Sequence, residues 1–316
     1  MTVPTGTLQT YQSTYNAEDV TDIIMNVSPY DTPALTLCAK HKAEATYTEW
    51  PIESLSAVDN ANANIEGDDA TIDTSTTPTR VGNHTQLMDK TVSTTTTQDA
   101  IKKYGAKIEF TRQKVKKGKE LKRDMETIML LNQARVVGAA GTAQKMRSMG
   151  SWLTTNVSRG AGGASGSATT AATDGTQRNF TEALFKTVIV SCATNANDMP
   201  DTVLAGPANR ANLSSQLSGN STRFYEVKEG TLNASISVYR SDYGPLKLMM
   251  DRFQRERDML LVNTDMLATR TLEPMQYVDL ARTGLTNKGQ MWTNFTLEVS
   301  NEAAHGVLAD LNTAVL

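Results

Sequence analysis

The chain has 316 residues, a formal net charge of −3, 39% hydrophobic residues and 6% aromatic residues. A weakly acidic balance argues against a protein that coats nucleic acid through a general basic surface, because such binding needs many cations facing phosphate. The hydrophobic fraction is below that of a typical compact domain, so we expect some segments to be buried against a partner.

The first 27 residues predict an extended arm followed by a short amphipathic helix. Residues 1–17 are polar and show no hydrophobic period. A helix capped by Asn16 would place four aliphatic residues on one face, namely Val20, Ile23, Ile24 and Val27. The prolines within residues 28–33 then end this helix.

Two strand-like stretches are separated by a long polar segment. The first strand is predicted at 44–50 and ends at Pro51, and the second runs from about 84 to 97. Frequent threonine favours such extended structure because its side chain is β-branched. A loop of this length is unusual inside a compact domain. We therefore expect a long β-hairpin that lies on another surface, because an isolated hairpin is barely stable in water.

The segment from about 106 to 137 predicts one long helix. It contains no proline and a single glycine, Gly118. A helix of ~32 residues would be roughly 48 Å long, and a helix of that length with one buried stripe indicates a structural spine. The residues of the stripe are Leu121, Met125, Ile128 and Met129.

The rest of the chain predicts short elements of both kinds. Residues 158–178 are rich in Gly, Ala, Ser and Thr and predict a flexible surface loop. A helix is predicted at 181–194, opened by Thr181. Short strands are predicted at 202–205, 232–239, 246–250, 259–262 and 290–299. The fold class is α+β, without βαβ alternation and without an internal repeat.

The sequence contains no recognisable catalytic or metal-binding motif. The histidines His41, His84 and His305 have no zinc-like spacing with each other or with the two cysteines. The Gly-rich run 160–166 lacks the spacing and the preceding strand of a dinucleotide loop. We therefore expect no catalytic residue, no metal site and no cofactor. A hydrolase that uses a cysteine or a carboxylate is the enzymatic alternative.

The sequence predicts neither secretion nor a membrane span. Its start lacks the basic and apolar regions of a secretory signal, and no apolar stretch is long enough to cross a bilayer. Cys38 and Cys192 have no close partner in the sequence. Both thiols are therefore expected to be free in a reducing cytosol.

Two clusters of opposite charge lie in the first half of the chain. The acidic cluster is at the centre of the predicted hairpin loop and consists of Glu66, Asp68 and Asp69. The basic cluster opens the predicted spine helix and consists of Arg112, Lys114, Lys116, Lys117, Lys119, Lys122 and Arg123. The helix dipole disfavours cations at that end. They are therefore expected to face water, an acidic partner surface or, least favoured, DNA.

The order of the predicted parts resembles the Hong Kong 97-type capsid fold: an N-terminal arm, a long hairpin, a long spine helix and a mixed α/β domain. Local motifs resemble one subfamily of tailed-phage major capsid proteins, once classed as a domain of unknown function. Their order and spacing carry the resemblance, which extends over most of the chain. They include Ser28-Pro29-Tyr30-Asp31-Thr32-Pro33, Glu49-Trp50, Glu66-Gly67-Asp68, Lys119-Glu120-Leu121-Lys122-Arg123-Asp124, Ser151-Trp152, Ser241-Asp242-Tyr243-Gly244, Arg252-Phe253 and Asn301-Glu302-Ala303-Ala304.

The resemblance implies a major capsid protein whose copies self-assemble as hexamers and pentamers into an icosahedral or elongated head. The head would enclose double-stranded DNA without sequence-specific binding, with a portal and scaffold or decoration proteins as partners and no membrane. The chain would be made in the bacterial host cytoplasm and end in the virion capsid. A shell protein of a cellular nanocompartment is the structural alternative.

The resemblance also implies five regions and a place for the two charge clusters. In this fold the hairpin of one subunit lies across its neighbour, so the acidic cluster of one chain is expected to meet the basic cluster of the next. The regions are an N-terminal arm with a first short helix (1–43), an extended-loop hairpin (44–97), a peripheral domain with the spine helix (98–178), an axial domain (179–266) and return strands to the peripheral domain with the C-terminus (267–316).

Overall fold

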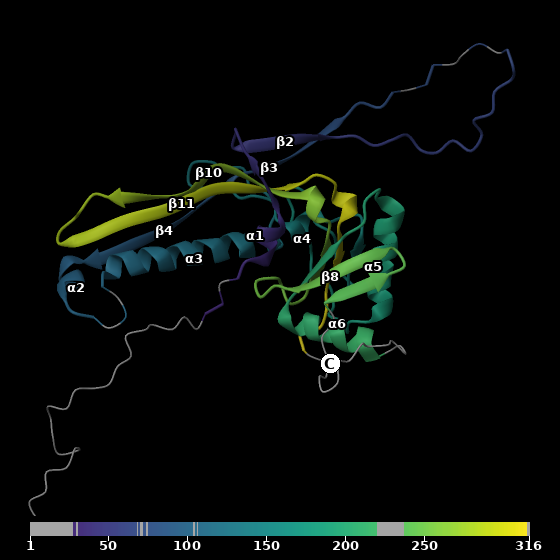
Figure 1. Ribbon diagram of the computed structural model, residues 1–316. Coiled ribbons are helices and arrows are strands. Elements are labelled where there is room, and N and C mark those ends of the chain that lie inside the picture. The colour runs from purple at the N-terminus through teal and green to yellow at the C-terminus, as the bar shows by residue number, and fades with distance from the viewer. Residues whose placement is uncertain are drawn as a thin grey trace, which may run out of the picture.

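The computed structural model describes residues 28–29, 31–67, 69, 72–73, 75–103, 105, 107–219 and 237–314. The arm and the amphipathic helix predicted before residue 28 lie outside these residues. Figure 1 shows an elongated body from which one hairpin projects. Among the described residues, no helix combines the length and the apolar character needed to cross a bilayer.

A four-stranded sheet and one long helix form one end of the body. The strands, in spatial order, are β1 (Ala39–Lys42), β10 (Leu267–Leu280), β11 (Thr286–Val299) and β4 (Gln86–Thr95). β1 is parallel to β10, and the other neighbours are antiparallel. Helix α3 (Glu109–Leu130) packs along β4 and β11. The short helices α1 (Pro33–Leu37) and α2 (Thr96–Ala100) lie near its two ends (Figure 1).

Alternation along β4 explains which face of this sheet α3 covers. Met88 and Val92 are buried, whereas Leu87 is 62% exposed. Successive side chains of a strand point to opposite faces of the sheet, so one face of β4 is apolar and packed. Leu121 and Met129 of α3 are fully buried in the core on this side. Packing of one apolar face, more than helix propensity, therefore stabilises α3.

A six-stranded mixed sheet forms the other end of the body. Its strands, in spatial order, are β5 (Val157–Ser158), β12 (Gly306–Leu308), β9 (Met259–Val262), β6 (Thr202–Ala205), β8 (Gly244–Met250) and β7 (Val238–Ser241). Every residue of β6, β9 and β12 is buried, as expected for strands covered on both faces. Helices α5 (Glu182–Asn195) and α6 (Pro207–Gly219) contact the sheet and each other. The remaining short helices are α4 (Met149–Trp152), η2 (Thr264–Met266) and η3 (Glu302–Ala304).

Several predicted elements are confirmed with close bounds. β6 and β9 occupy the predicted residues, and α5 follows Thr181, whose hydroxyl accepts the N–H of Leu184. The strand predicted at 232–239 is described only from Val238 onward. β10 is missing from the predicted strands. Its register shifts around Glu273 interrupt the two-residue period by which a strand is recognised in a sequence.

The predicted hairpin is right in its first arm and wrong in its second. β2 (Tyr47–Ile52) pairs with β3 (Thr79–His84), and the two form a separate two-stranded sheet. The strand predicted at 84–97 is β4, which pairs with β11 in the covered sheet. Between β3 and β4, the Thr85 N–H donates to the Thr46 carbonyl at 2.8 Å and closes the hairpin base. Buried and exposed residues alternate along β4, as expected for a strand in a sheet that a helix covers on one face and not for a projecting arm.

The spine helix is shorter than predicted. α3 has 22 residues and is therefore roughly 33 Å long, because it ends at Leu130 and not near Gly138. The side chain of Asn132 forms two hydrogen bonds with the backbone of Ala172, at 2.6 and 2.8 Å. These tertiary hydrogen bonds draw the chain into an extended path that the local sequence does not indicate.

The glycine-rich residues 158–178 are not a free surface loop, contrary to the prediction. The carboxylate of Asp310 accepts the N–H of Gly160 at 3.0 Å and the N–H of Gly175 at 2.8 Å. Ala164 and Thr173 pair across the segment. A buried acceptor from the far end of the chain thus holds this segment on the body.

The expectation of no βαβ alternation is corrected at one place. β6 and β8 are parallel neighbours, and α6 follows β6 directly in the chain. Parallel strands need a crossover connection, usually a helix. The prediction was wrong here because α6 was not among the predicted elements.

Candidate subunit interface

The hairpin β2–β3 is anchored to the body at its base. Trp50 is buried, its indole N–H donates to the Val299 carbonyl at 3.1 Å, and its ring lies 5.8 Å from that of Trp152. Beyond this base, residues 53–78 form a loop that projects away from both sheets (Figure 1). The base is therefore part of the core, whereas the loop is not.

The projecting loop exposes large aliphatic side chains. The exposed fractions are 97% for Leu55, 88% for Val58, 79% for Ile65 and 99% for Ile72. Burying one such side chain is worth about 1.5–3 kcal/mol. A series of exposed apolar residues on one projection marks a surface that contacts another molecule.

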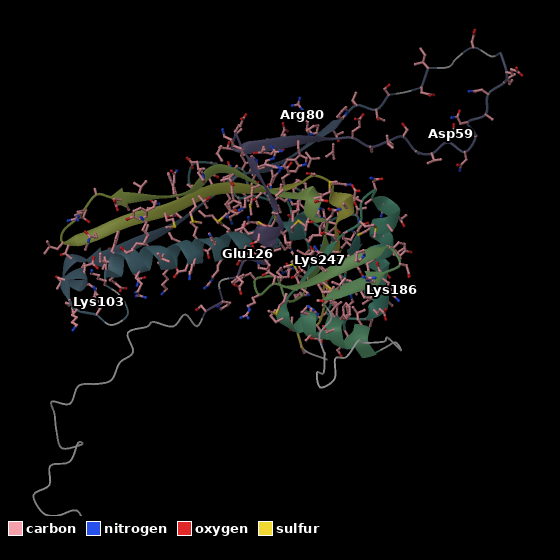
Figure 2. The ribbon with its side chains drawn as sticks, in the orientation of Figure 1. Asp59, Arg80, Lys103, Glu126, Lys186 and Lys247 are labelled. Carbon is pink, nitrogen blue, oxygen red and sulfur yellow. The ribbon has the colours of Figure 1, made fainter. Side chains whose placement is uncertain are left out.

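The acidic cluster lies in this loop. Glu66 and Asp69 are exposed, Gly67 adopts φ 89° at the turn, and Asp68 lies outside the described residues. Figure 2 shows Asp59 of the loop and Lys103, near the start of α3, at opposite ends of the molecule. The acidic and basic clusters therefore do not meet within one subunit.

Two members of the basic cluster are paired on their own helix. Arg112 bonds the carboxylate of Glu109, and Lys117 lies 2.7 Å from a carboxylate oxygen of Glu120. The hydrogen bond from Arg112 lowers the pKa of Glu109 to about 2. These two cations are largely neutralised within the subunit.

Two further members lie against aromatic rings. The Lys114 ammonium is 3.3 Å from the ring centroid of Tyr277 on β10, and the Arg123 guanidinium is 5.7 Å from that of Phe253. A cation over an aromatic face is attracted by the ring quadrupole, at about 0.5–2 kcal/mol. The prediction of one uniform cationic face is therefore too simple, because at least five of the seven cations, Lys119 among them, interact with other groups of the protein.

The other three members, Lys116, Lys119 and Lys122, are exposed. Lys119 and Lys122 border a surface groove of about 370 Å³ beside α3. Thr111 and Lys114 also line the groove, and its apolar floor comes from Val115 and Gly118 on α3 and from Met275 and Met291 on the sheet. The sequence analysis missed this apolar floor. The two methionines are far from α3 in sequence, and Val115, which is 59% exposed, stands alone among lysines.

Of the cysteines and histidines that the sequence analysis considered, Cys38, Cys192 and His305 are buried, whereas His41 is exposed and His84 is partly exposed. Cys38 and Cys192 are free thiols, and burial raises the pKa of each to about 12, so neither forms a thiolate near neutral pH. Burial lowers the pKa of His305 to about 4. In the part of the chain that the structure describes, no three His, Cys, Asp or Glu side chains form a group suited to a metal ion.

The sequence matches a family of capsid proteins. The model of the SU10 major capsid protein family aligns with residues 4–312. The chain is also 39% identical, over 110 residues, to the major capsid protein of Escherichia phage Phieco32. That alignment covers 34% of this chain and 31% of the relative, so it spans about a third of the relative's length.

Solved capsid structures share the fold at low sequence identity. A chain of the cyanophage A-1(L) capsid superposes with a TM-score of 0.66 at 13% identity, over 96% of this chain and 99% of that chain. An encapsulin from Synechococcus elongatus superposes with a TM-score of 0.52 at 12% identity, over 94% and 93%. The Hong Kong 97-type fold predicted from the sequence is confirmed. Because both kinds of shell use it, the fold alone does not separate phage heads from cellular compartments.

Proposed function

The chain belongs to the SU10 major capsid protein family, the major capsid proteins of tailed phages, and we propose how its copies build the head. Copies associate as hexamers and pentamers and close into an icosahedral or elongated shell around double-stranded DNA. A portal and scaffold or decoration proteins complete the particle. The chain is made in the host cytoplasm before it enters the virion capsid.

The exposed aliphatic residues of the projecting loop carry this proposal. Leu55, Val58, Ile65 and Ile72 cover no apolar surface among the described residues of their own subunit, since the loop points away from the body. A second copy supplies that surface in a closed shell. The same association also accounts for a composition with fewer apolar residues than a self-contained domain of this size.

The five regions take distinct roles in this arrangement. The part of the arm region (1–43) before α1 and the projecting loop of the hairpin region (44–97) reach neighbouring copies. The peripheral domain (98–178), together with β1, β4 and the return strands (267–316), forms the outer part of a capsomer, and the axial domain (179–266) lies near its symmetry axis. Two hydrophobic clusters support this division. One lies between the six-stranded sheet and helices α5 and α6, and the other joins α3 and the four-stranded sheet to the opposite face of the six-stranded sheet.

The acidic loop tip of one copy and α3 of the next form a complementary pair. In this proposal Glu66, Asp68 and Asp69 approach Lys116, Lys119 and Lys122, while Ile65 covers the apolar groove floor of Val115, Met275 and Met291. Arg112, Lys114, Lys117 and Arg123 contribute less, because they are less exposed than the three lysines. Each exposed pair contributes only about 0–1 kcal/mol. Complementary charge then sets the register and rate of association more than its affinity.

Charge reversal tests the pairing. Glu66→Lys, Asp68→Lys and Asp69→Lys together should slow shell formation in low salt, measured by light scattering and negative-stain microscopy. Asp59→Lys, in the same loop but away from the tip, is the matched control and should assemble normally. Adding Lys116→Glu, Lys119→Glu and Lys122→Glu should restore much of the rate.

Two results would contradict the pairing. One is normal assembly of the triple acidic reversal, and the other is a combined variant that assembles no better than the acidic reversal alone. If the lysine reversals by themselves form normal empty shells but fewer DNA-filled heads, then the exposed face of α3 meets DNA and not a neighbouring loop. DNA-filled heads would also separate a phage capsid from a nanocompartment shell.

A further inference from the structure

A buried carboxylate links the spine helix to the first described helix. Glu126 lies near the end of α3, between the two sheets (Figure 2), and is fully buried. Its two carboxylate oxygens accept the N–H groups of Ala34 and Leu35, each at 2.7 Å. Both residues belong to α1, which follows the N-terminal segment. Glu126 therefore fixes the root of that segment on the spine.

A second buried carboxyl group reaches Glu126 from the six-stranded sheet. Asp251 directly follows β8, is fully buried, and places its carboxyl group next to that of Glu126. Its Oδ1 accepts the N–H of Phe253 at 2.8 Å, and its own N–H donates to the Ala205 carbonyl at 2.9 Å. Its Oδ2 is buried and has no donor among the described residues. Two ionised carboxylates have no hydrogen between them, so this contact requires one shared proton.

No cation neutralises the pair. Helix α1 has no ionisable side chain, and the nearest group after it is the buried thiol of Cys38. On α3, Arg123 lies over the ring of Phe253, and Asp124 is paired with Lys90 at 2.6 Å. Arg252, next to Asp251, is exposed. In the described part of the chain, the proton alone makes this contact attractive.

We infer that Glu126 and Asp251 form a proton-controlled latch, in which one shared proton holds the end of β8 on the spine helix. When the proton is present, the two carboxyl groups attract each other and the end of β8 is held on α3. When it leaves, two like charges face each other in a buried site, and separation of the β8 end from α3 relieves the repulsion, whereas the N–H groups of Ala34 and Leu35 still bind the Glu126 carboxylate. The latch lies within one subunit, so it does not depend on how copies meet in a shell.

The titration of Glu126 supports the latch and gives its direction. Burial and the neighbouring Asp251 raise the pKa of Glu126 from 4.5 to about 8. The folded chain keeps the proton over a range in which the unfolded chain releases it. The stabilisation is therefore complete below pH 4.5, decreases as pH rises, and is lost above about pH 8.

The variant Asp251→Asn tests the latch. An asparagine amide donates to the Glu126 carboxylate without a shared proton, and its oxygen still accepts from Phe253. In urea denaturation, the urea concentration at the midpoint of wild-type unfolding should decrease as pH rises from 6 to 9. The Asp251→Asn variant should not show this decrease. In hydrogen exchange over this range, the peptide with Asp251 and Phe253, whose N–H groups are hydrogen-bonded at the end of β8, should gain exchange in the wild type beyond the intrinsic pH effect. Asp124→Asn, also on the spine, is the matched control and should keep the wild-type pH dependence.

An infrared measurement on the wild-type protein needs no variant. A protonated carboxyl band should be present at neutral pH and disappear as pH rises through about 8, and Glu126→Gln should lack it. A wild type without this band, or an Asp251→Asn variant that keeps the full pH dependence, would overturn the latch. Failure of the proposed loop pairing would leave these measurements unchanged, because they concern a single subunit.

Discussion

Two segments of similar composition behave in opposite ways. Residues 53–78 and 158–178 are both rich in small and polar side chains. The first projects from the body with its aliphatic residues exposed, whereas the second is held on the body by backbone hydrogen bonds. The first segment contains more large aliphatic residues, yet it is the exposed one. Hydrophobicity alone therefore does not decide which segment packs on its own chain.

The difference lies in where the partner of each segment comes from. The second segment surrounds Asp310, which is fully buried, has φ 59°, and lies 2.9 Å from Arg257. The first segment has no such anchor on its own subunit, and we propose that a neighbouring copy provides one. A loop is ordered where a buried partner satisfies its backbone or covers its side chains.

Removal of the Asp310 carboxylate, which anchors residues 158–178, should have the largest effect on the stability of the subunit. Asp310→Ala leaves two backbone N–H groups without their acceptor and removes one acceptor of the Arg257 guanidinium, which should cost about 3–5 kcal/mol of unfolding free energy. Asp310→Asn should cost less, because asparagine tolerates the left-handed backbone and keeps one acceptor oxygen. Urea denaturation measures both. Equal and small losses in the two variants would show that the carboxylate is not the anchor.

Substitution of one glycine in each segment tests the same difference, with a smaller expected effect on stability. Gly67 and Gly162 have φ of 89° and 80°, and an added Cβ would meet no atom within 4 Å at either position. Gly162→Ala should cost about 1–2 kcal/mol, because an L-residue is strained at positive φ. Gly67→Ala should leave the unfolding free energy of the isolated subunit almost unchanged, since its loop adds little to that fold. Equal losses in the two variants would remove the distinction between the loops.

Polar substitution of the projecting loop should have the smallest effect on subunit stability. Leu55→Ser, Val58→Ser, Ile65→Ser and Ile72→Ser together should change the unfolding free energy by no more than about 0.5 kcal/mol, as for other surface changes. The same variant should fail to form shells, as judged by negative-stain microscopy. Val137→Ser, at a residue of the body that is 65% exposed, controls for a general loss of surface hydrophobicity. Normal shells from the loop variant would contradict its role as a contact.

Sequence patterns correctly predicted the elements that are determined by residues close to them along the chain. Thr181 and the apolar spacing after it define α5, and the continuous apolar run of β9 identifies a central strand. The end of α3 was not predictable in this way, because it depends on hydrogen bonds between Asn132 and Ala172. The second arm of the hairpin was mistaken for the same reason, since β4 is defined by its distant partner β11.

The candidate interface was only partly predictable. The basic cluster is visible in the sequence, but the partners of Lys114 and Arg123 are Tyr277 and Phe253, which only the fold brings close. The pair of Glu126 and Asp251 left no signal in the sequence. Each is a single acidic residue in an ordinary sequence context, and only the fold shows that both are buried and close together.

The pairing of β4 with β11 has a consequence for synthesis of the chain. Asp89 and Gln290, which are hydrogen-bonded across these strands, are 201 positions apart. Translation therefore delivers β4 and α3 long before the strands that complete their sheet, and until then β4 lacks its pairing strand and α3 lacks its contact with β11. We expect the nascent chain to need shielding by chaperones during this interval. A polypeptide released early from the ribosome would be unable to complete this sheet and so could not enter a growing shell.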